Sequence, residues 1–200
     1  MAEKSREKSI IEAAKERFAH FGFSKVTMEE IASDVDLGKA SLYYYFPTKE
    51  DLFKAVISLE QNQLKENIEG LLQKNAPASE KLHEYVKLRL KFFQDLINLG
   101  TLSVHSYFET KSVFKEVFID FEKIELSLIE RIINEGKSSK EFNPELSEDT
   151  ALIFLHVLQG LRCRVLRWAK GQGLDTEAHN SLQKEMNMVT EIFINGIIFK

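Results

Sequence analysis

The residues from Gly38 to Lys49, GKASLYYYFPTK, carry the side chains of this sequence that are best suited to recognise another molecule. Lys39, Ser41 and three consecutive tyrosines would share one short helix, which ends before Pro47 because proline disfavours helical angles in the residue preceding it. A lysine ammonium donates to guanine O6 or N7, a serine hydroxyl serves several bases, and an alanine methyl packs on the thymine methyl. The segment therefore predicts a helix that reads DNA in the major groove, and nothing in it resembles a catalytic site.

The predicted DNA contacts divide by their place on this helix. The first residues of a recognition helix point at base edges, whereas hydroxyls and the amides at helix starts contact phosphates and set the register. Base contacts are predicted for Lys39, Ala40, Ser41 and Tyr43, and phosphate contacts for Thr27, Tyr44 and Lys49. The remaining face, formed by Leu42, Tyr45 and Phe46, is predicted to pack against the core. A competing interpretation assigns the whole tyrosine run to packing.

Short helices on the N-terminal side would position this segment. Thr27-Met28-Glu29-Glu30 is a capping box, in which the threonine hydroxyl accepts from the third amide and the last carboxylate reaches back, so a helix starts there. Asp36-Leu37-Gly38 reads as a tight turn, because aspartate tolerates the left-handed conformation. Residues 28–46 thus predict a helix-turn-helix, and apolar residues at three- and four-residue steps before Gly22 predict a supporting helix.

The rest of the chain predicts helices and no strands. Apolar residues recur at helical spacing in six further segments, near residues 49–73, 79–98, 101–108, 112–135, 147–170 and from 175 to the end. The expected fold class is therefore all-α, with about nine helices. Because the composition shifts after residue 47, we expect a helix-turn-helix DNA-binding domain over residues 1–47 and a larger helical domain over residues 48–200.

Residues 10–56 resemble the N-terminal domain of the tetracycline-repressor (TetR) family. The resemblance rests on the patterns Ile11-x-x-Ala14-x-x-x-Phe18, Gly22-Phe23, Thr27-Met28-x-x-Ile31-Ala32 and Leu42-Tyr43-x-x-Phe46-x-x-Lys49-x-x-Leu52. Asp36 and Gly38 depart from the family, which often has glycine and a hydroxyl cap at these positions. The resemblance implies a homodimeric regulator of transcription, not an enzyme, whose C-terminal domain binds a small ligand and dimerises. It implies most often a repressor that the ligand releases from double-stranded operator DNA.

A second copy of the chain is expected, because one helix-turn-helix reads few bases and paired recognition helices sit about one DNA turn (~34 Å) apart. The 147–170 segment is apolar nearly all round, which predicts burial on more than one side, and the last helix carries a matching stripe. The family resemblance implies the same two helices. The predicted dimer residues are Leu158, Leu161, Val165, Leu182, Met186, Val189 and Phe193. The alternative is that they form only the core of one chain.

The resemblance also implies that the middle helices sense a small effector. These helices are rich in aromatic residues, so a mostly apolar effector is expected, although any single aromatic side chain more often fills the core. The predicted ligand-binding residues are Tyr85, Phe92, Tyr107, Phe108, Phe118, His156 and Cys163. No cofactor and no metal are expected, because the sequence holds no His-x-x-x-His or Cys-x-x-Cys pair.

The charge of the chain limits how it can bind DNA. The formal net charge is −4, and residues 1–49 hold 8 basic and 8 acidic side chains, so DNA affinity must come from a few well-placed cations. The single cysteine, Cys163, excludes an intrachain disulfide and fits a reducing compartment. The N-terminal residues lack an apolar signal segment, and the longest uncharged apolar run has twelve residues, too few to span a bilayer. A cytoplasmic protein without a membrane partner is expected.

Two other functional classes are weaker interpretations. A hydrolase would need a nucleophile and a base, and the nearest pair, Ser103 and His105, is two residues apart on a helix and does not share a face. A ligand-binding or scaffold protein of the same fold without DNA binding remains open, because residues 1–49 have no basic surplus.

Overall fold

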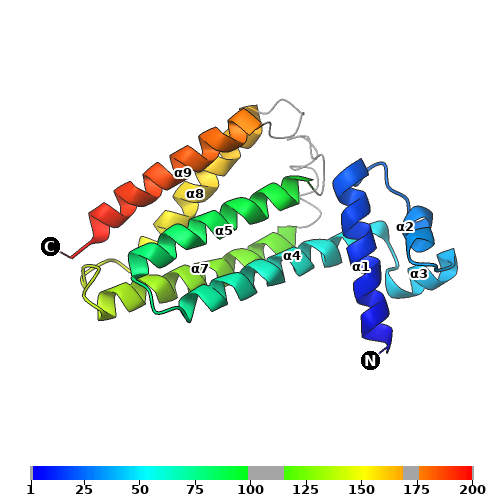
Figure 1. The fold of residues 1–200 in the computed structure, drawn as a ribbon, viewed down its shortest axis with the longest axis horizontal. Coiled ribbons are helices and arrows are strands. Elements are labelled where there is room, and N and C mark those ends of the chain that lie inside the picture. Colours follow the sequence, from blue (N-terminus) through cyan, green and yellow to red (C-terminus); the bar gives the residue numbers. More distant parts are fainter. Residues whose placement is uncertain (1, 99–114, 169–175, 200) are drawn as a thin grey trace.

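The computed structural model of the chain describes residues 2–98, 115–168 and 176–199, which form eight α-helices. Three helices near the N-terminus lie at one end of an elongated molecule, and the C-terminus lies at the other end (Figure 1). They are α1 (Ala2–Phe21), α2 (Met28–Asp34) and α3 (Lys39–Tyr45). The longer helices are α4 (Lys49–Leu72), α5 (Ala78–Asn98), α7 (Lys115–Ser138), α8 (Thr150–Trp168) and α9 (Thr176–Ile197). The predicted all-α class is confirmed; the short helix expected over residues 101–108 lies outside the described residues.

None of the helices in the described ranges is both long enough and apolar enough to cross a membrane.

The predicted start and stop signals of the first helices are present. Gly22 adopts a φ of 80°, where glycine carries no steric penalty, and its amide donates to the Phe18 carbonyl at 3.0 Å. The Thr27 capping box is complete, with the Thr27 amide donating to Glu30 at 2.8 Å. Asp36 has a φ of 53°, so aspartate takes the left-handed position of the turn, as expected. These signals place α3 directly after α2.

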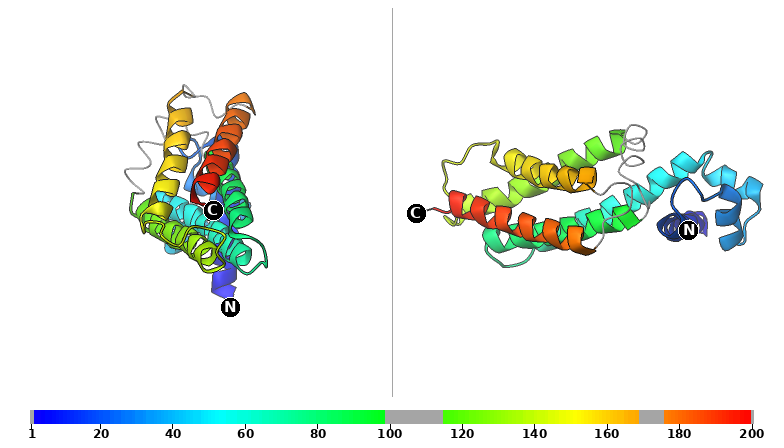
Figure 2. Two further views of the ribbon diagram at one scale, coloured as in Figure 1. Left: turned by 90° about the vertical axis from the view of Figure 1, so that its left-hand side faces the viewer. Right: turned by 90° about the horizontal axis from the view of Figure 1, so that it is seen from above.

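One helix, α4, belongs to both cores of the molecule. Its residues 52–57 contribute four buried side chains to the core that α1, α2 and α3 share. Its Leu64, Ile68 and Leu71 are buried instead with side chains of α5, α7, α8 and α9. The right-hand view of Figure 2 shows α4 reaching from the three small helices into the larger bundle. The predicted boundary after residue 47 stays a prediction, and α4 is the element through which the two parts are continuous.

A charged network is buried between α5 and α7. The Arg89 Nε donates to Glu125 Oε1 at 2.6 Å, and the Tyr85 hydroxyl donates to the same oxygen at 2.7 Å. Burial and the Glu125 charge raise the pKa of Tyr85 well above its ordinary value, so the phenol stays protonated. Burial alone would lower the pKa of Arg89, but the Glu125 carboxylate outweighs it and raises that pKa. Losing one partner of such a pair costs about 3–5 kcal/mol, so the network fixes how α5 and α7 face each other.

The end of the bundle farthest from α3 is closed by the connection between α7 and α8. The Glu141 carboxylate accepts from the amides of Ala78 and Ser79, at 2.7 and 3.0 Å, and so caps the start of α5. Partial burial would raise the pKa of Glu141, but the hydrogen bonds from Ser79 and Ala78 outweigh it and lower that pKa. The C-terminal residues join this connection, where the Phe199 amide donates to the Glu141 carbonyl at 2.9 Å.

Candidate nucleic-acid interface

Helix α3 buries one face and exposes the other. Leu42 and Phe46 are 0% and 6% exposed in the core with α1, α2 and α4, which confirms their predicted packing. Tyr45 is half-buried against the same core. The five residues predicted to face DNA from this helix are all exposed, with Tyr43 at 38% and Tyr44 at 75%: Lys39, Ala40, Ser41, Tyr43 and Tyr44. In Figure 1, α2 and α3 lie at the outer end of the molecule, with α1 between them and the bundle.

The ammonium of Lys39 is held by a neighbouring acid. Lys39 Nζ pairs with Glu29 on α2, and both side chains are at least half exposed. The hydrogen bond from Lys39 lowers the pKa of Glu29, and the same hydrogen bond raises the pKa of Lys39. An exposed pair of this kind contributes little to stability because water screens it, so a DNA acceptor can replace Glu29. Glu29 was not predicted to act here, since only the fold brings α2 and α3 together.

The position of α2 is set by an arginine that the sequence did not point to. Arg17 on α1 donates to the Asp34 carboxylate from two nitrogens, Nε and Nη2, and Nη2 lies 2.8 Å from Oδ1. Its Nη1 lies 3.5 Å from the Glu30 carboxylate. Two parallel contacts between a guanidinium and a carboxylate fix direction as well as distance. The hydrogen bond from Arg17 lowers the pKa of Asp34. Thr27, a predicted phosphate contact, is exposed, but its hydroxyl already serves the capping box with Glu30.

Lys49 holds the connection between α1 and α2. Its ammonium donates to the carbonyls of Phe23 at 2.9 Å and Val26 at 3.1 Å, and it lies 4.5 Å from the centre of the Phe23 ring. Two of its three N–H donors are therefore taken by this connection. The contact fastens the start of α4 to the connection that leads into α2. Its predicted phosphate contact stays a prediction, with one donor left for it.

The residues predicted to bind a ligand have different surroundings, as far as the structure describes them. Tyr85 is fully buried in the network with Glu125, and Phe92 packs on Phe121 with ring centres 5.4 Å apart. Phe118 is half-buried and packs instead against the core of the three N-terminal helices. His156 is exposed on α8, and its predicted ligand contact stays a prediction. The remaining candidates are Cys163, which is half-buried, and Tyr107 and Phe108, which lie outside the described residues.

Most of the residues predicted to face a second copy lie in the core of their own chain. Leu158, Leu182, Met186 and Val165 are between 0% and 7% exposed, so they have almost no surface to offer a partner. This burial favours the alternative that they form only the core of one chain, and their place in a dimer interface stays a prediction. A helix that is apolar nearly all round does not reveal from its sequence which stripe turns inward. The other three, Leu161, Val189 and Phe193, are half-buried, and Phe193 stacks on Phe154 at 4.3 Å.

A different stripe on the same two helices is exposed. Ile153 and Val157 on α8 are 56% and 41% exposed, and Met188 and Ile192 on α9 are 55% and 65% exposed. The two helices lie side by side and run antiparallel (Figures 1 and 2). Arg164 on α8 pairs with Glu185 on α9, and counting seven residues along each helix from this pair places Val157 level with Ile192. We name Ile153, Val157, Met188 and Ile192 the outer stripe.

Within the described ranges, no group of three or more His, Cys, Asp or Glu side chains is arranged to hold a metal ion.

Sequence and structure comparisons agree with this arrangement. A family model described as bacterial regulatory proteins of the tetR family matches residues 10–56, and one described as the C-terminal region of QacR-like proteins matches residues 60–198. The chain is 26% identical over 193 residues to the HTH-type transcriptional regulator QacR of Staphylococcus aureus, covering 94% of this chain and 96% of that protein. It is 27% identical over 175 residues to the regulator YhgD of Bacillus subtilis, covering 82% and 85% of the two chains.

Solved structures share the whole architecture. A transcriptional regulator from Cytophaga hutchinsonii is 40% identical, with a TM-score of 0.87 over 94% of this chain and 96% of that chain. FadR of Bacillus subtilis, solved in complex with stearoyl-CoA, has the same fold at 22% identity, with a TM-score of 0.67 over 95% and 98% of the two chains. With its helix-turn-helix, its QacR-like C-terminal region and these relatives, the chain belongs to the TetR family of DNA-binding transcriptional regulators.

Proposed function

We propose that the protein is a cytoplasmic, homodimeric repressor that a small, mostly apolar effector releases from its operator DNA. The observation that carries the proposal is the division of α3, which buries Leu42 and Phe46 and leaves its polar first turn exposed. A recognition helix needs such a division, because one face must be held rigidly while the other enters the major groove.

Each exposed residue of the interface has a proposed role. Lys39 exchanges Glu29 for a base acceptor, and Ala40, Ser41 and Tyr43 contact neighbouring base edges. Phosphate contacts are proposed for Thr27, Tyr44 and the remaining donor of Lys49. With no basic surplus in residues 1–49, these few contacts must supply most of the affinity.

The outer stripe is the proposed dimer surface. Its four exposed apolar side chains lie on two adjacent helices, and exposed apolar patches mark protein interaction sites. Pairing two copies there would hide this stripe and set the distance between the two α3 helices. The half-buried Leu161, Val189 and Phe193 lie on the same two helices and are proposed to contribute to its edge.

The effector would act through α4, which shares both cores. The bundle interior beside α4 is lined by aromatic residues such as Phe92, Phe93 and Phe121, which suits an apolar ligand. FadR, which shares this fold, was solved with stearoyl-CoA bound. A ligand that shifts α4 would change the spacing of the two α3 helices, and coupling of about 1–3 kcal/mol would lower DNA affinity between about five- and 150-fold.

Footprinting on the DNA upstream of the protein's own gene tests this proposal. We expect one protected site with two half-sites. We also expect Lys39→Met to weaken the discrimination between bases at symmetric positions of the half-sites by about 1–3 kcal/mol. Lys123→Met is the control, because Lys123 is exposed on α7 and pairs with Asp120 far from α3. A folded protein that protects no DNA there or in a random-sequence selection would favour the ligand-binding or scaffold interpretation instead.

A further inference from the structure

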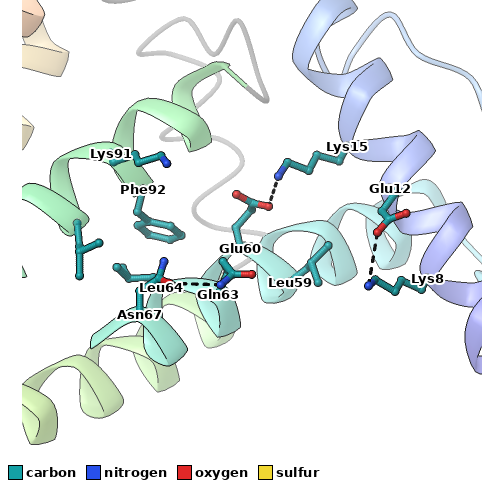
Figure 3. Close-up of a pocket in the computed structure, with 11 residues that line it drawn as sticks. Lys8, Glu12, Lys15, Leu59, Glu60, Gln63, Leu64, Asn67, Lys91 and Phe92 are labelled. Carbon is teal, nitrogen blue, oxygen red and sulfur yellow. Dashed lines mark hydrogen bonds and ion pairs between the residues drawn. The ribbon is translucent and has the colours of Figure 1, made fainter. Parts of the chain in front are cut away.

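A groove of about 410 Å³ lies where α1, α4 and α5 meet. Figure 3 shows its walls, with α1 on one side, α5 on the other and α4 as the floor. Its size lies within the range of small-molecule sites. The lining residues used below are Lys8, Glu12, Lys15 and Glu60, with Lys91, Phe92 and their neighbours on α4 and α5.

The charges in this groove do not cancel. Glu60 on α4 is 9% exposed and pairs with Lys15 on α1, and Lys8 lies 3.7 Å from Glu12. Lys91 on α5 is exposed and has no ion pair with any residue that the structure describes. In Figure 3 it extends across the groove toward the Lys15–Glu60 pair. Three lysines and two glutamates therefore leave one positive charge, concentrated where Lys91 and Lys15 flank a single carboxylate.

The rest of the lining is apolar with two amides. Phe92 and Leu64 are buried at the floor, and Leu59 and Leu88 are half-buried beside them. The side-chain amides of Gln63 and Asn67 meet at 3.4 Å and keep donors that a ligand oxygen can use. A ligand with a flat apolar body and one anionic end would match both the apolar and the cationic part.

We propose that this groove binds a small amphipathic monoanion. Its carboxylate would pair with Lys91, the groove lysine without an ion pair among the described residues, and its apolar body would lie over Leu59, Leu88 and Phe92. The site goes beyond the proposed function, since it opens between α1, α4 and α5, although Leu64 and Phe92 border both the groove and the bundle core. A ligand here would bridge α1 and α5, and α1 also carries Arg17, which grips α2 through Asp34. The bound ligand would therefore fix the helix-turn-helix relative to the bundle.

Calorimetry with two matched probes tests the site without any DNA. The probes are naphthoate and its neutral amide, naphthamide. We expect naphthoate to bind the full chain about ten-fold more tightly than naphthamide, because an ammonium–carboxylate contact in a half-enclosed groove adds that much. We expect Lys91→Met to remove this difference. Lys87→Met is the control, since Lys87 is exposed one turn earlier on α5 and pairs with Glu84 instead.

Three outcomes would overturn the proposal. The wild-type chain binds no naphthoate saturably, it binds both probes equally, or Lys91→Met binds naphthoate as tightly as the wild type. The Lys91 side chain is exposed, so its replacement leaves both cores intact and the variant remains folded. Because the readout is ligand binding, it stands or fails independently of whether the protein binds an operator.

Discussion

At the scale of single residues, the cations near the predicted DNA surface are already engaged. Lys39 pairs with Glu29, Arg17 holds Asp34, and Lys49 donates to two carbonyls. These three cations differ in the free energy needed to break their present contacts. Glu29 is exposed and can be rehydrated, whereas the carbonyls of Phe23 and Val26 would lose a half-buried donor. Lys39 is therefore suited to change partners on DNA, while Lys49 and Arg17 mainly hold the elements in place.

We predict that Lys49→Met lowers the free energy of unfolding by about 1–3 kcal/mol, because two carbonyls lose a charged donor. Thermal unfolding followed by circular dichroism measures the loss, expected as a drop of several degrees. Lys25→Met in the same connection is the control, since the Lys25 side chain is exposed. If Lys49→Met unfolds at the wild-type temperature, the two hydrogen bonds of Lys49 do not stabilise the fold. A direct DNA contact would then be the remaining role of Lys49.

At the scale of elements, helix ends depend on groups distant in sequence. The start of α2 is capped locally by Thr27 and Glu30, but the start of α5 is capped by Glu141, 63 residues from Ala78. A local cap depends on residues close in sequence, as Thr27 shows. Thr48 shows the same at the start of α4, where its hydroxyl accepts from the Asp51 amide at 3.0 Å. The Glu141 cap depends on the path of the connection after α7, so it follows only from the fold.

We predict that Glu141→Gln lowers stability at neutral pH by about 0.5–2 kcal/mol, as the loss of a helix cap does. The folded-state pKa of Glu141 lies below its ordinary value of 4.5, so its contribution is present above pH 4.5 and is lost as pH falls through the lower value. The stability difference between wild type and Glu141→Gln should therefore shrink in acid. Denaturant titrations across this pH range measure it.

Glu145→Gln is the matched control for that series, because Glu145 lies exposed in the same connection. A difference between Glu141→Gln and wild type that stays constant down to pH 3 would contradict the ionised cap.

At the scale of the whole molecule, the outer stripe is the proposed dimer surface, and pairing there would let two α3 helices act together. Its four apolar side chains lie on α8 and α9, while α3 lies at the far end of the chain from the C-terminus of α9 (Figure 1). Helix α4 is packed into both cores, so a spacing set at the stripe would reach α3 through α4. Dimer formation and DNA affinity should therefore be linked by mass action.

We predict that Ile192→Glu dissociates the dimer, since a carboxylate buried without a partner costs about 3–5 kcal/mol, or roughly a hundred- to several-thousand-fold in affinity. Sedimentation velocity measures the change in mass. Ile119→Glu on α7 is the control, because Ile119 is also exposed but lies outside the stripe. If both variants remain dimeric, the partner surface lies elsewhere.

The sequence by itself determined the local features: the helices, the Thr27 and Thr48 caps, the left-handed Asp36 and the inward face of Leu42 and Phe46. Each of these depends on residues fewer than about five positions apart, where spacing and backbone preference are enough. The family pattern over residues 10–56 is of the same kind.

Only the tertiary structure decided which cation meets which acid and which apolar stripe stays outside. Leu158 and Ile192 are both aliphatic residues on amphipathic helices, yet one is buried and the other 65% exposed, because the answer depends on where the neighbouring helices pack. In the same way, Glu29, Arg17 and Glu141 gained their roles from partners brought close by the fold. Long-range contacts and burial depend on the whole chain, so no local spacing could have supplied them.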